Sequence, residues 1–89
     1  MPRVVFTANL QRHISAPPSQ VSGRTVRAAL EAVFAVNPRL RSYVLDDQGR
    51  VRHHVVVFIG GQRIHDPVTL NDPVGESDEI FVMQALSGG

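Results

Sequence analysis

The sequence contains no cysteine. This absence excludes disulfide bonds, thiolate metal ligands and cysteine nucleophiles. Lysine is missing too, so all nine basic residues are arginines, and a biased codon usage is the simplest explanation. Whatever its origin, the absence leaves no side-chain amine for Schiff-base chemistry or for accepting an isopeptide bond.

A strong net charge and long apolar runs are also missing. The formal net charge is +1, so we expect neither nucleic acid nor a membrane surface as a partner. No apolar run approaches the roughly 18 residues of a membrane-spanning helix, and the apolar part of "MPRVVFTANL" is too short for a signal peptide. We therefore expect a cytoplasmic protein. Its 89 residues, 43% of them hydrophobic, predict one domain with one core.

The first half of the chain predicts two strands and a helix. Val4–Leu10, rich in β-branched and aromatic residues, is typical of a strand. Pro17–Pro18 cannot donate to a central ladder, which favours a turn and then a short edge strand around Ser19–Ser22. Apolar residues recur at helical spacing over Thr25–Asn37, with a threonine N-cap, and Pro38 predicts the end of that helix.

The second half predicts three more strands. Asp46–Gly49 is a turn, and Val51–Ile59 is the strongest strand in the sequence. Gly60–Gly61 is a two-residue hairpin signal, and Gln62–His65 is the short return strand. After the turn-rich "LNDPVGESDE", the apolar Ile80–Leu86 is the last strand.

These elements predict an α+β architecture, in which one main helix packs across one face of a sheet. Within the helix, Leu30, Val33 and Phe34 share the apolar stripe, so we expect them to be buried against the sheet. Neither the first nor the last strand has the polar character of an exposed edge. We therefore expect these two strands side by side in the middle of the sheet.

The strand "HVVVFI" is apolar on both faces, and the helix can cover only one of them. Val56 and Phe58 belong to one alternating set, which we interpret as a partner surface. The alternative is that a loop covers the outward set. The arginines of "RVRHH" and "RLR" favour a solvated face, with a docking patch for an acidic partner as the other interpretation.

The other polar residues indicate no catalytic or metal site. His53 and His54 are adjacent on the predicted strand, so we expect them on opposite faces, where they cannot share a metal ion. His65–Asp66 predicts a turn with local hydrogen bonds, and Asp78–Glu79 is placed to cap a turn or to pair with an arginine. No nucleophile–base pair is evident, so we do not expect an enzyme.

The last residues, Ser87, Gly88 and Gly89, have no apolar side chain to bury in a core. Because glycine has the most conformational freedom to lose, we expect a domain over residues 1–86 and a flexible tail over 87–89. Such a tail is either a frayed end or the presentation of a working carboxylate at Gly89.

The order strand-strand-helix-strand-strand-strand followed by Gly-Gly resembles the ubiquitin-like β-grasp family. The resemblance to prokaryotic sulfur carriers is closest: the small subunit of molybdopterin synthase, the thiamine-pathway carrier and a carrier used in cysteine biosynthesis. It covers nearly the whole chain, including "TVRAALEAVFAVNPRLRSYVLDDQGRVRHHVVVFIGGQRI", "PVGESDEIFVMQA" and the terminal "SGG". The Gly60–Gly61 pair stands where these proteins often carry Asn-Gly, which suits the same tight turn. The resemblance implies a mixed sheet of about five strands.

The resemblance also implies a function in which the protein is a cosubstrate. An adenylating activating enzyme would use ATP on the Gly89 carboxylate, a sulfur donor would convert the adenylate to a thiocarboxylate, and a biosynthetic enzyme would accept the sulfur. Gly88 and Ser87 would be recognised in a narrow channel, and the protein itself would bind no cofactor. Without a thiol, the Gly89 carboxyl is the natural site for carrying sulfur. The alternative is a non-carrier binding module that acts through its sheet surface.

Overall fold

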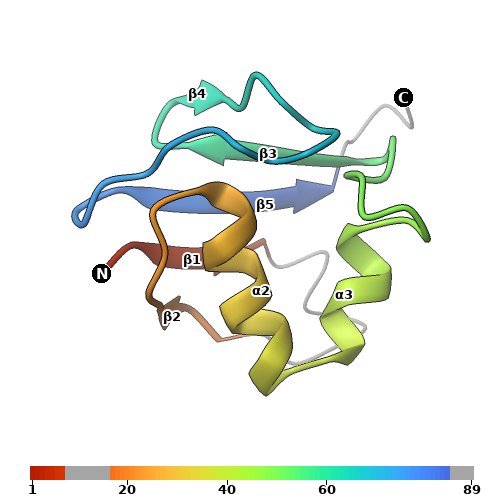
Figure 1. Ribbon diagram of the computed structural model, residues 1–89, viewed down its shortest axis with the longest axis horizontal. Helices are drawn as coiled ribbons and strands as arrows, with labels where there is room; N and C mark the ends of the chain where they lie inside the picture. The colour runs from red at the N-terminus through yellow and green to blue at the C-terminus, as the bar shows by residue number, and fades with distance from the viewer. Residues whose placement is uncertain (8–16, 85–89) are drawn as a thin grey trace.

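One mixed five-stranded sheet carries two helices on one face (Figure 1). The computed structural model describes residues 1–7 and 17–84; residues 8–16 and 85–89 lie outside this description. Along the described chain the elements are β1 (Arg3–Phe6), β2 (Ser19–Gln20), α2 (Val26–Val36), α3 (Arg39–Val44), β3 (Val55–Ile59), β4 (Gln62–Arg63) and β5 (Glu79–Gln84). The α+β prediction is confirmed.

The last strand lies in the centre of the sheet, whose order is β2-β1-β5-β3-β4. β5 runs parallel to β1, with Val4 opposite Ile80, and antiparallel to β3, with Val57 opposite Val82. The prediction that the first and last strands are neighbours in the middle is therefore confirmed. Both of the outermost strands, β2 and β4, have two residues each, so little ladder is left open at the edges.

The main helix begins and ends where the sequence predicts. The Thr25 side chain accepts a hydrogen bond from the Ala28 N–H at 3.1 Å, which satisfies one of the free donors of the first turn. At the other end the Asn37 N–H donates to the Val33 carbonyl at 2.9 Å, just before Pro38. The buried side chains of α2 are Val26, Ala29, Leu30, Val33 and Phe34. The predicted apolar stripe is confirmed.

A second helix, α3, was not predicted from the sequence. It is only six residues long, and its N-cap residue, Pro38, has no side chain that can cap it. Leu40 and Val44 are buried at 1% and 0% exposure, so tertiary packing holds this helix in place. It packs beside α2 and covers the same face of the sheet (Figure 1).

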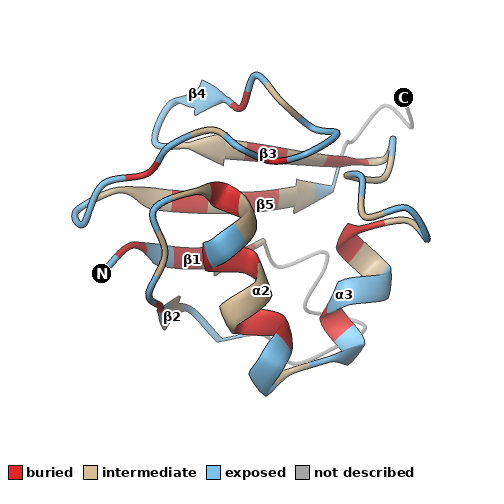
Figure 2. Cartoon of the chain, viewed as in Figure 1, coloured by how far each residue is buried: buried red, intermediate tan, exposed pale blue. Residues whose placement is uncertain are grey.

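The core lies between the helices and the sheet, as the buried residues of Figure 2 show. Along β1, β3 and β5, buried positions alternate with half-buried or exposed ones over most of each strand. The side chains that each strand directs into the core are Val4 and Phe6 of β1, Val55 and Val57 of β3, and Ile80 and Val82 of β5. This alternation fixes which residues face away from the helices.

Arg27 holds the loops against the helix α2. Its Nε donates to the Thr69 carbonyl at 2.8 Å, and its Nη2 donates to the Gly49 carbonyl at 2.9 Å. One guanidinium thus joins two loops that are distant in sequence, because its planar fork presents several donors at fixed angles.

Candidate functional site

The end of β5 is the point from which the chain continues towards its last residues. Buried Ile80 and Val82 anchor this strand, and both neighbouring strands bond to it. The Thr7 N–H donates to the Val82 carbonyl at 3.1 Å, while Gln84 pairs with Val55 at the start of β3. The exit from the sheet is therefore fixed on both sides.

The predicted carrier residue Gly89 and the predicted tail residues Gly88 and Ser87 lie outside the described residues. So does the end of the predicted last strand, whose described part ends at Gln84. The roles assigned to these residues remain predictions.

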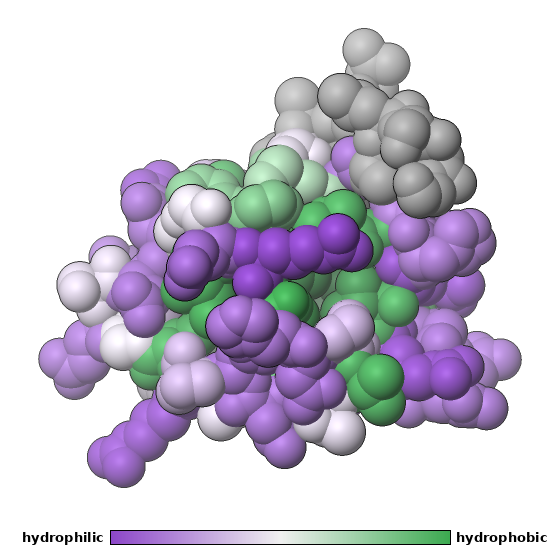
Figure 3. Space-filling view, turned by 90° about the horizontal axis from the view of Figure 1, so that it is seen from above, coloured by the Kyte–Doolittle hydropathy of each residue, from purple (hydrophilic) through white to green (hydrophobic). Residues whose placement is uncertain are grey.

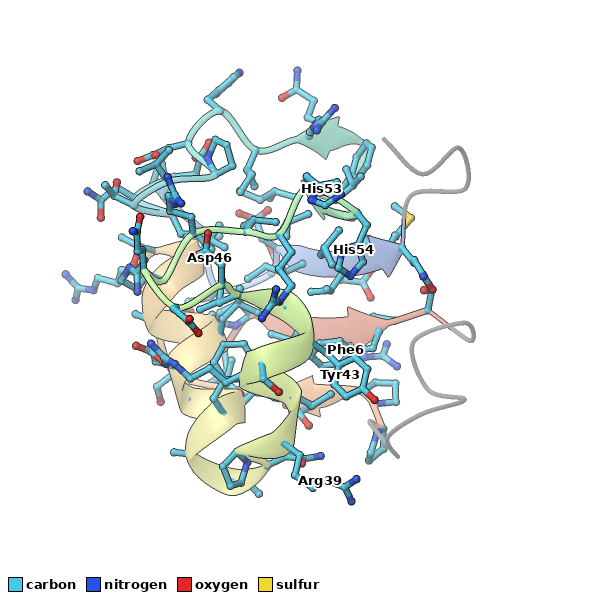
Figure 4. The ribbon with its side chains drawn as sticks, turned by 90° about the vertical axis from the view of Figure 1, so that its right-hand side faces the viewer. Phe6, Arg39, Tyr43, Asp46, His53 and His54 are labelled. Carbon is cyan, nitrogen blue, oxygen red and sulfur yellow. The ribbon has the colours of Figure 1, made fainter. Side chains whose placement is uncertain are left out.

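The strand prediction for His53 and His54 is wrong. β3 begins at Val55, because the Val55 N–H donates to the Arg52 carbonyl at 2.9 Å and closes a turn over the two histidines. Their rings lie 5.5 Å apart at 82°, edge to face, instead of on opposite faces. In Figure 4, which looks onto the side where β5 ends, both lie near the end of that strand. Val51, the first residue of the predicted strand, forms a bridge with Leu45 and does not belong to β3. This contact explains why the two histidines lie in a turn.

Val56 and Phe58 lie on the face of the sheet opposite to the helices. Both are half-buried, and they stand opposite Met83 and Phe81 of β5, with Val5 of β1 beside Phe81. We call these five residues the open sheet face. Figure 3 looks onto the molecule from the β4 edge, where apolar surface lies between strongly hydrophilic side chains; the open sheet face is seen there only edge-on. Neither of the helices in the described part of the chain covers this face (Figure 1).

The Asp46 carboxylate organises the turn before β3. Its Oδ1 accepts hydrogen bonds from the backbone N–H groups of Gln48 and Arg50, both at 2.9 Å, and its Oδ2 pairs with the Arg50 Nε at 3.1 Å. The bond from the Arg50 N–H lowers the pKa of this carboxyl, because it stabilises the ionised form. Asp46 is thus a structural anion that Arg50 neutralises.

The predicted hydrogen-bonded turn at His65–Asp66 is confirmed. The Asp66 carboxylate accepts hydrogen bonds from the backbone N–H groups of Val68, Thr69 and Asn71. The Thr69 hydroxyl, which also donates to it, makes the largest contribution to lowering the pKa of Asp66 to about 2.

The prediction for Asp78–Glu79 is confirmed in both of its forms. The Asp78 carboxylate accepts a hydrogen bond from the Gly75 N–H at 2.7 Å, and Glu79 pairs with Arg3 at 3.5 Å. Both carboxylates therefore have structural partners, Gly75 and Arg3.

The described residues offer few side chains that could carry out catalysis or bind a metal ion. Within residues 1–7 and 17–84, no group of three or more histidine, aspartate and glutamate side chains is placed to hold a metal ion. In the same part of the chain, no helix is long and apolar enough to cross a membrane. The described residues present an apolar sheet face and charged turns.

Several solved structures resemble this fold over almost its whole length. The crystal structure of SAMP1, a small archaeal modifier protein from Haloferax volcanii, has a TM-score of 0.77 at 26% identity and covers 99% of this chain and 98% of its own. The chain has the ubiquitin-like β-grasp fold. The family resemblance that the sequence indicated is thus confirmed.

Two further structures with this β-grasp fold are similar at lower identity. SAMP1 from Methanosarcina acetivorans has a TM-score of 0.80 at 23% identity, covering 99% of this chain and 95% of its own. CysO of Amycolatopsis orientalis, solved in complex with BexX, has a TM-score of 0.82 at 15% identity, and the two chains cover each other completely. No protein-family profile and no curated protein matches the sequence.

Proposed function

We propose that this protein is a sulfur carrier whose Gly89 carboxylate is converted to a thiocarboxylate. The observation that supports this most is the β-grasp fold with β5 at its centre, in which Gln84, the last residue of that strand, is held by its pairing with Val55 of β3. Similarity to SAMP1 and CysO structures over almost the whole chain adds support. The protein would act as a cosubstrate of separate enzymes.

The proposed chemistry takes two steps. A carboxylate is a poor electrophile, so an activating enzyme first lets the Gly89 carboxylate attack the α-phosphate of ATP, forming an acyl adenylate and releasing pyrophosphate. Sulfide, supplied by a sulfur donor, then attacks the acyl carbon and displaces AMP, which leaves the thiocarboxylate. A biosynthetic enzyme of the cysteine, thiamine or molybdopterin type accepts this sulfur. Because the first step consumes ATP, we place the reaction in the cytoplasm.

The tail residues Ser87 and Gly88 would thread a narrow channel in the activating enzyme. Glycine has no β-carbon to widen such a channel, and a misplacement of about 1 Å can cost roughly a hundredfold in rate. Val56 and Phe58 on the open sheet face would contact the same enzyme, because half-buried apolar side chains on a face that neither of the described helices covers favour a protein partner.

The open sheet face also favours a second candidate function. In that alternative the protein is a binding module that acts through Val56, Phe58 and their neighbours, and the glycine pair has no role. The two candidates differ in one respect: only the carrier needs the Gly89 carboxyl.

The experiment uses the absence of cysteine. Protein isolated from its native cells is first weighed by mass spectrometry, to establish that Gly89 is the last residue. Purified protein is then incubated with the activating enzyme, ATP and sulfide, and treated with a thiol-alkylating reagent. Since the sequence contains no cysteine, the thiocarboxylate is the expected site of alkylation. Alkylation also distinguishes sulfur from the oxidation of methionine, which adds nearly the same mass.

We expect wild-type protein to be labelled at Gly89 and the variant that lacks Gly89 to remain unlabelled. Consecutive Cα atoms are about 3.8 Å apart, so the deletion withdraws the carboxyl by up to that distance, which a preorganised site cannot absorb. The deletion should leave the unfolding temperature unchanged, because chain ends outside the core contribute little. Omission of ATP is the matched control. Equal labelling of the truncated protein would refute the carrier function in favour of the binding module.

A further inference from the structure

A pocket of about 370 Å³ lies between residues 46–53, which precede β3, and the loop around Pro67. Three nitrogen-bearing side chains line it: Arg50, Arg52 and His53. A neutral histidine ring offers one N–H donor and an arginine offers five. The pocket therefore presents several donors and, apart from Asp46, no negatively charged side chain.

The two arginines of this pocket differ in how they are neutralised. Arg50 pairs with Asp46, so these two lining residues cancel each other. Arg52 donates from its Nε to the Ser42 carbonyl at 2.7 Å, and no carboxylate within residues 1–7 and 17–84 pairs with it. The bond to Ser42 fixes the guanidinium while its other N–H groups stay free of an acidic partner. A held but unneutralised arginine is suited to a carboxylate from outside.

Three apolar side chains also line the pocket. They are Val51, Pro67 and Val68, and Val68 is one of the large hydrophobic side chains that remain exposed, at 54%. The Val51 N–H donates to the Pro67 carbonyl at 2.9 Å, so this bond ties the segment before β3 to the loop around Pro67. The pocket thus combines a fixed cationic group with a fixed apolar surface.

The pocket lies at the same end of the sheet as the exit of β5. Arg52 accepts through its carbonyl the hydrogen bond from Val55, and Val55 pairs with Gln84. A protein that receives the chain after Gln84 would therefore meet this turn. Figure 4 shows His53 and Asp46 on this side of the molecule.

We propose that this pocket receives an acidic side chain, flanked by an apolar one, from a protein that binds this chain. The carboxylate meets Arg52 and the His53 ring, and the apolar side chain lies on Val51 and Val68. The identification of the partner as the activating enzyme rests on the proposed carrier function. The recognition of an acidic side chain by the pocket does not depend on that function.

The first test needs no natural partner. Isotope-labelled full-length protein is titrated with a short blocked peptide of alternating glutamate and leucine, and then with one of glutamine and leucine. We expect the glutamate peptide alone to shift the amide resonances of residues 50–53 and 67–68. Arg52→Gln should weaken this binding about two- to fivefold at low salt, and salt near 1 M should abolish the difference. Arg63→Gln, an exposed arginine on β4, is the matched control and should bind as wild type.

Equal shifts with both peptides, or shifts confined to other residues, would overturn the proposal. The wild-type comparison decides this even if Arg52→Gln is poorly folded. With the activating enzyme, Arg52→Gln should raise the KM for the carrier by a similar factor and leave kcat unchanged, whereas Arg63→Gln should change neither. If the wild-type protein acquires no sulfur at all, the carrier function fails, while the peptide titration still decides the role of the pocket.

Discussion

Replacing Phe34 by alanine tests the packing between helix and sheet, on which the position of β5 depends. Phe34 is only 4% exposed, and the Arg41 guanidinium carbon lies 5.9 Å from its ring centroid. Val36, two residues later on the same helix, is 88% exposed. The pair therefore offers a buried position and a matched exposed one in the same element.

The expected cost follows from this burial. Truncation of a buried phenylalanine to alanine lowers the free energy of unfolding by about 3–5 kcal/mol, because transfer free energy is lost and a cavity is left behind. Loss of the contact with Arg41 adds about 0.5–1 kcal/mol at such an exposed cation–π site. A domain of this size is stable by roughly 4–13 kcal/mol in total. The variant therefore loses a large share of its stability, and its unfolding temperature should fall by at least about 12 °C.

Urea unfolding followed by circular dichroism gives the free energies for Phe34→Ala, Phe34→Leu and Val36→Ala. Phe34→Leu should cost less than Phe34→Ala, since it leaves a smaller cavity, and it remains measurable if the alanine variant is largely unfolded. Val36→Ala should change stability by less than about 0.5 kcal/mol. A loss below about 0.5 kcal/mol for Phe34→Ala, or an equal loss for Val36→Ala, would refute the packing described for α2.

Two further predictions concern the turns. Because folding lowers the pKa of Asp66 from 3.8 to about 2, the stabilisation from its ionised form is complete above about pH 4 and is lost as the pH falls towards 2. Unfolding temperatures measured over that range should decline in the wild type and less steeply in Asp66→Asn; parallel curves would contradict the assignment. Gly60 has a φ of 58°, so Gly60→Ala should cost about 1–2 kcal/mol. Gly61→Ala, with open space around the new Cβ, should cost clearly less in urea unfolding, and equal losses would refute the strain argument.

The parts of the fold predicted from sequence are those with local signals. The N-cap at Thr25, the apolar spacing after it and the proline that ends it are all within one stretch, and α2 matches them. The apolar run from Ile80 predicted the last strand, and β5 covers Glu79–Gln84. The neighbouring positions of β1 and β5 followed from their apolar character alone.

The parts that were missed depend on contacts between distant residues. Nothing local distinguishes α3, which is held by the burial of Leu40 and Val44. Val51 bridges to Leu45, so the strand starts only at Val55 and His53 and His54 lie in a turn before it. The sequence offered Arg50 and Arg52 as part of a docking patch for an acidic partner, but it did not reveal the pocket, whose lining forms only when residues 50–53 lie beside 67–68.

The central position of β5 has a consequence for how the chain reaches this fold during synthesis. A ribosome releases β1, β2, α2 and β3 first, yet β1 and β3 are joined only through β5, at Glu79–Gln84. Until that strand emerges, each of them exposes one unpaired edge, of the kind that invites pairing with other chains. Closing such long-range pairings is slow compared with forming a local helix. The strand at the centre of the sheet therefore completes the domain last.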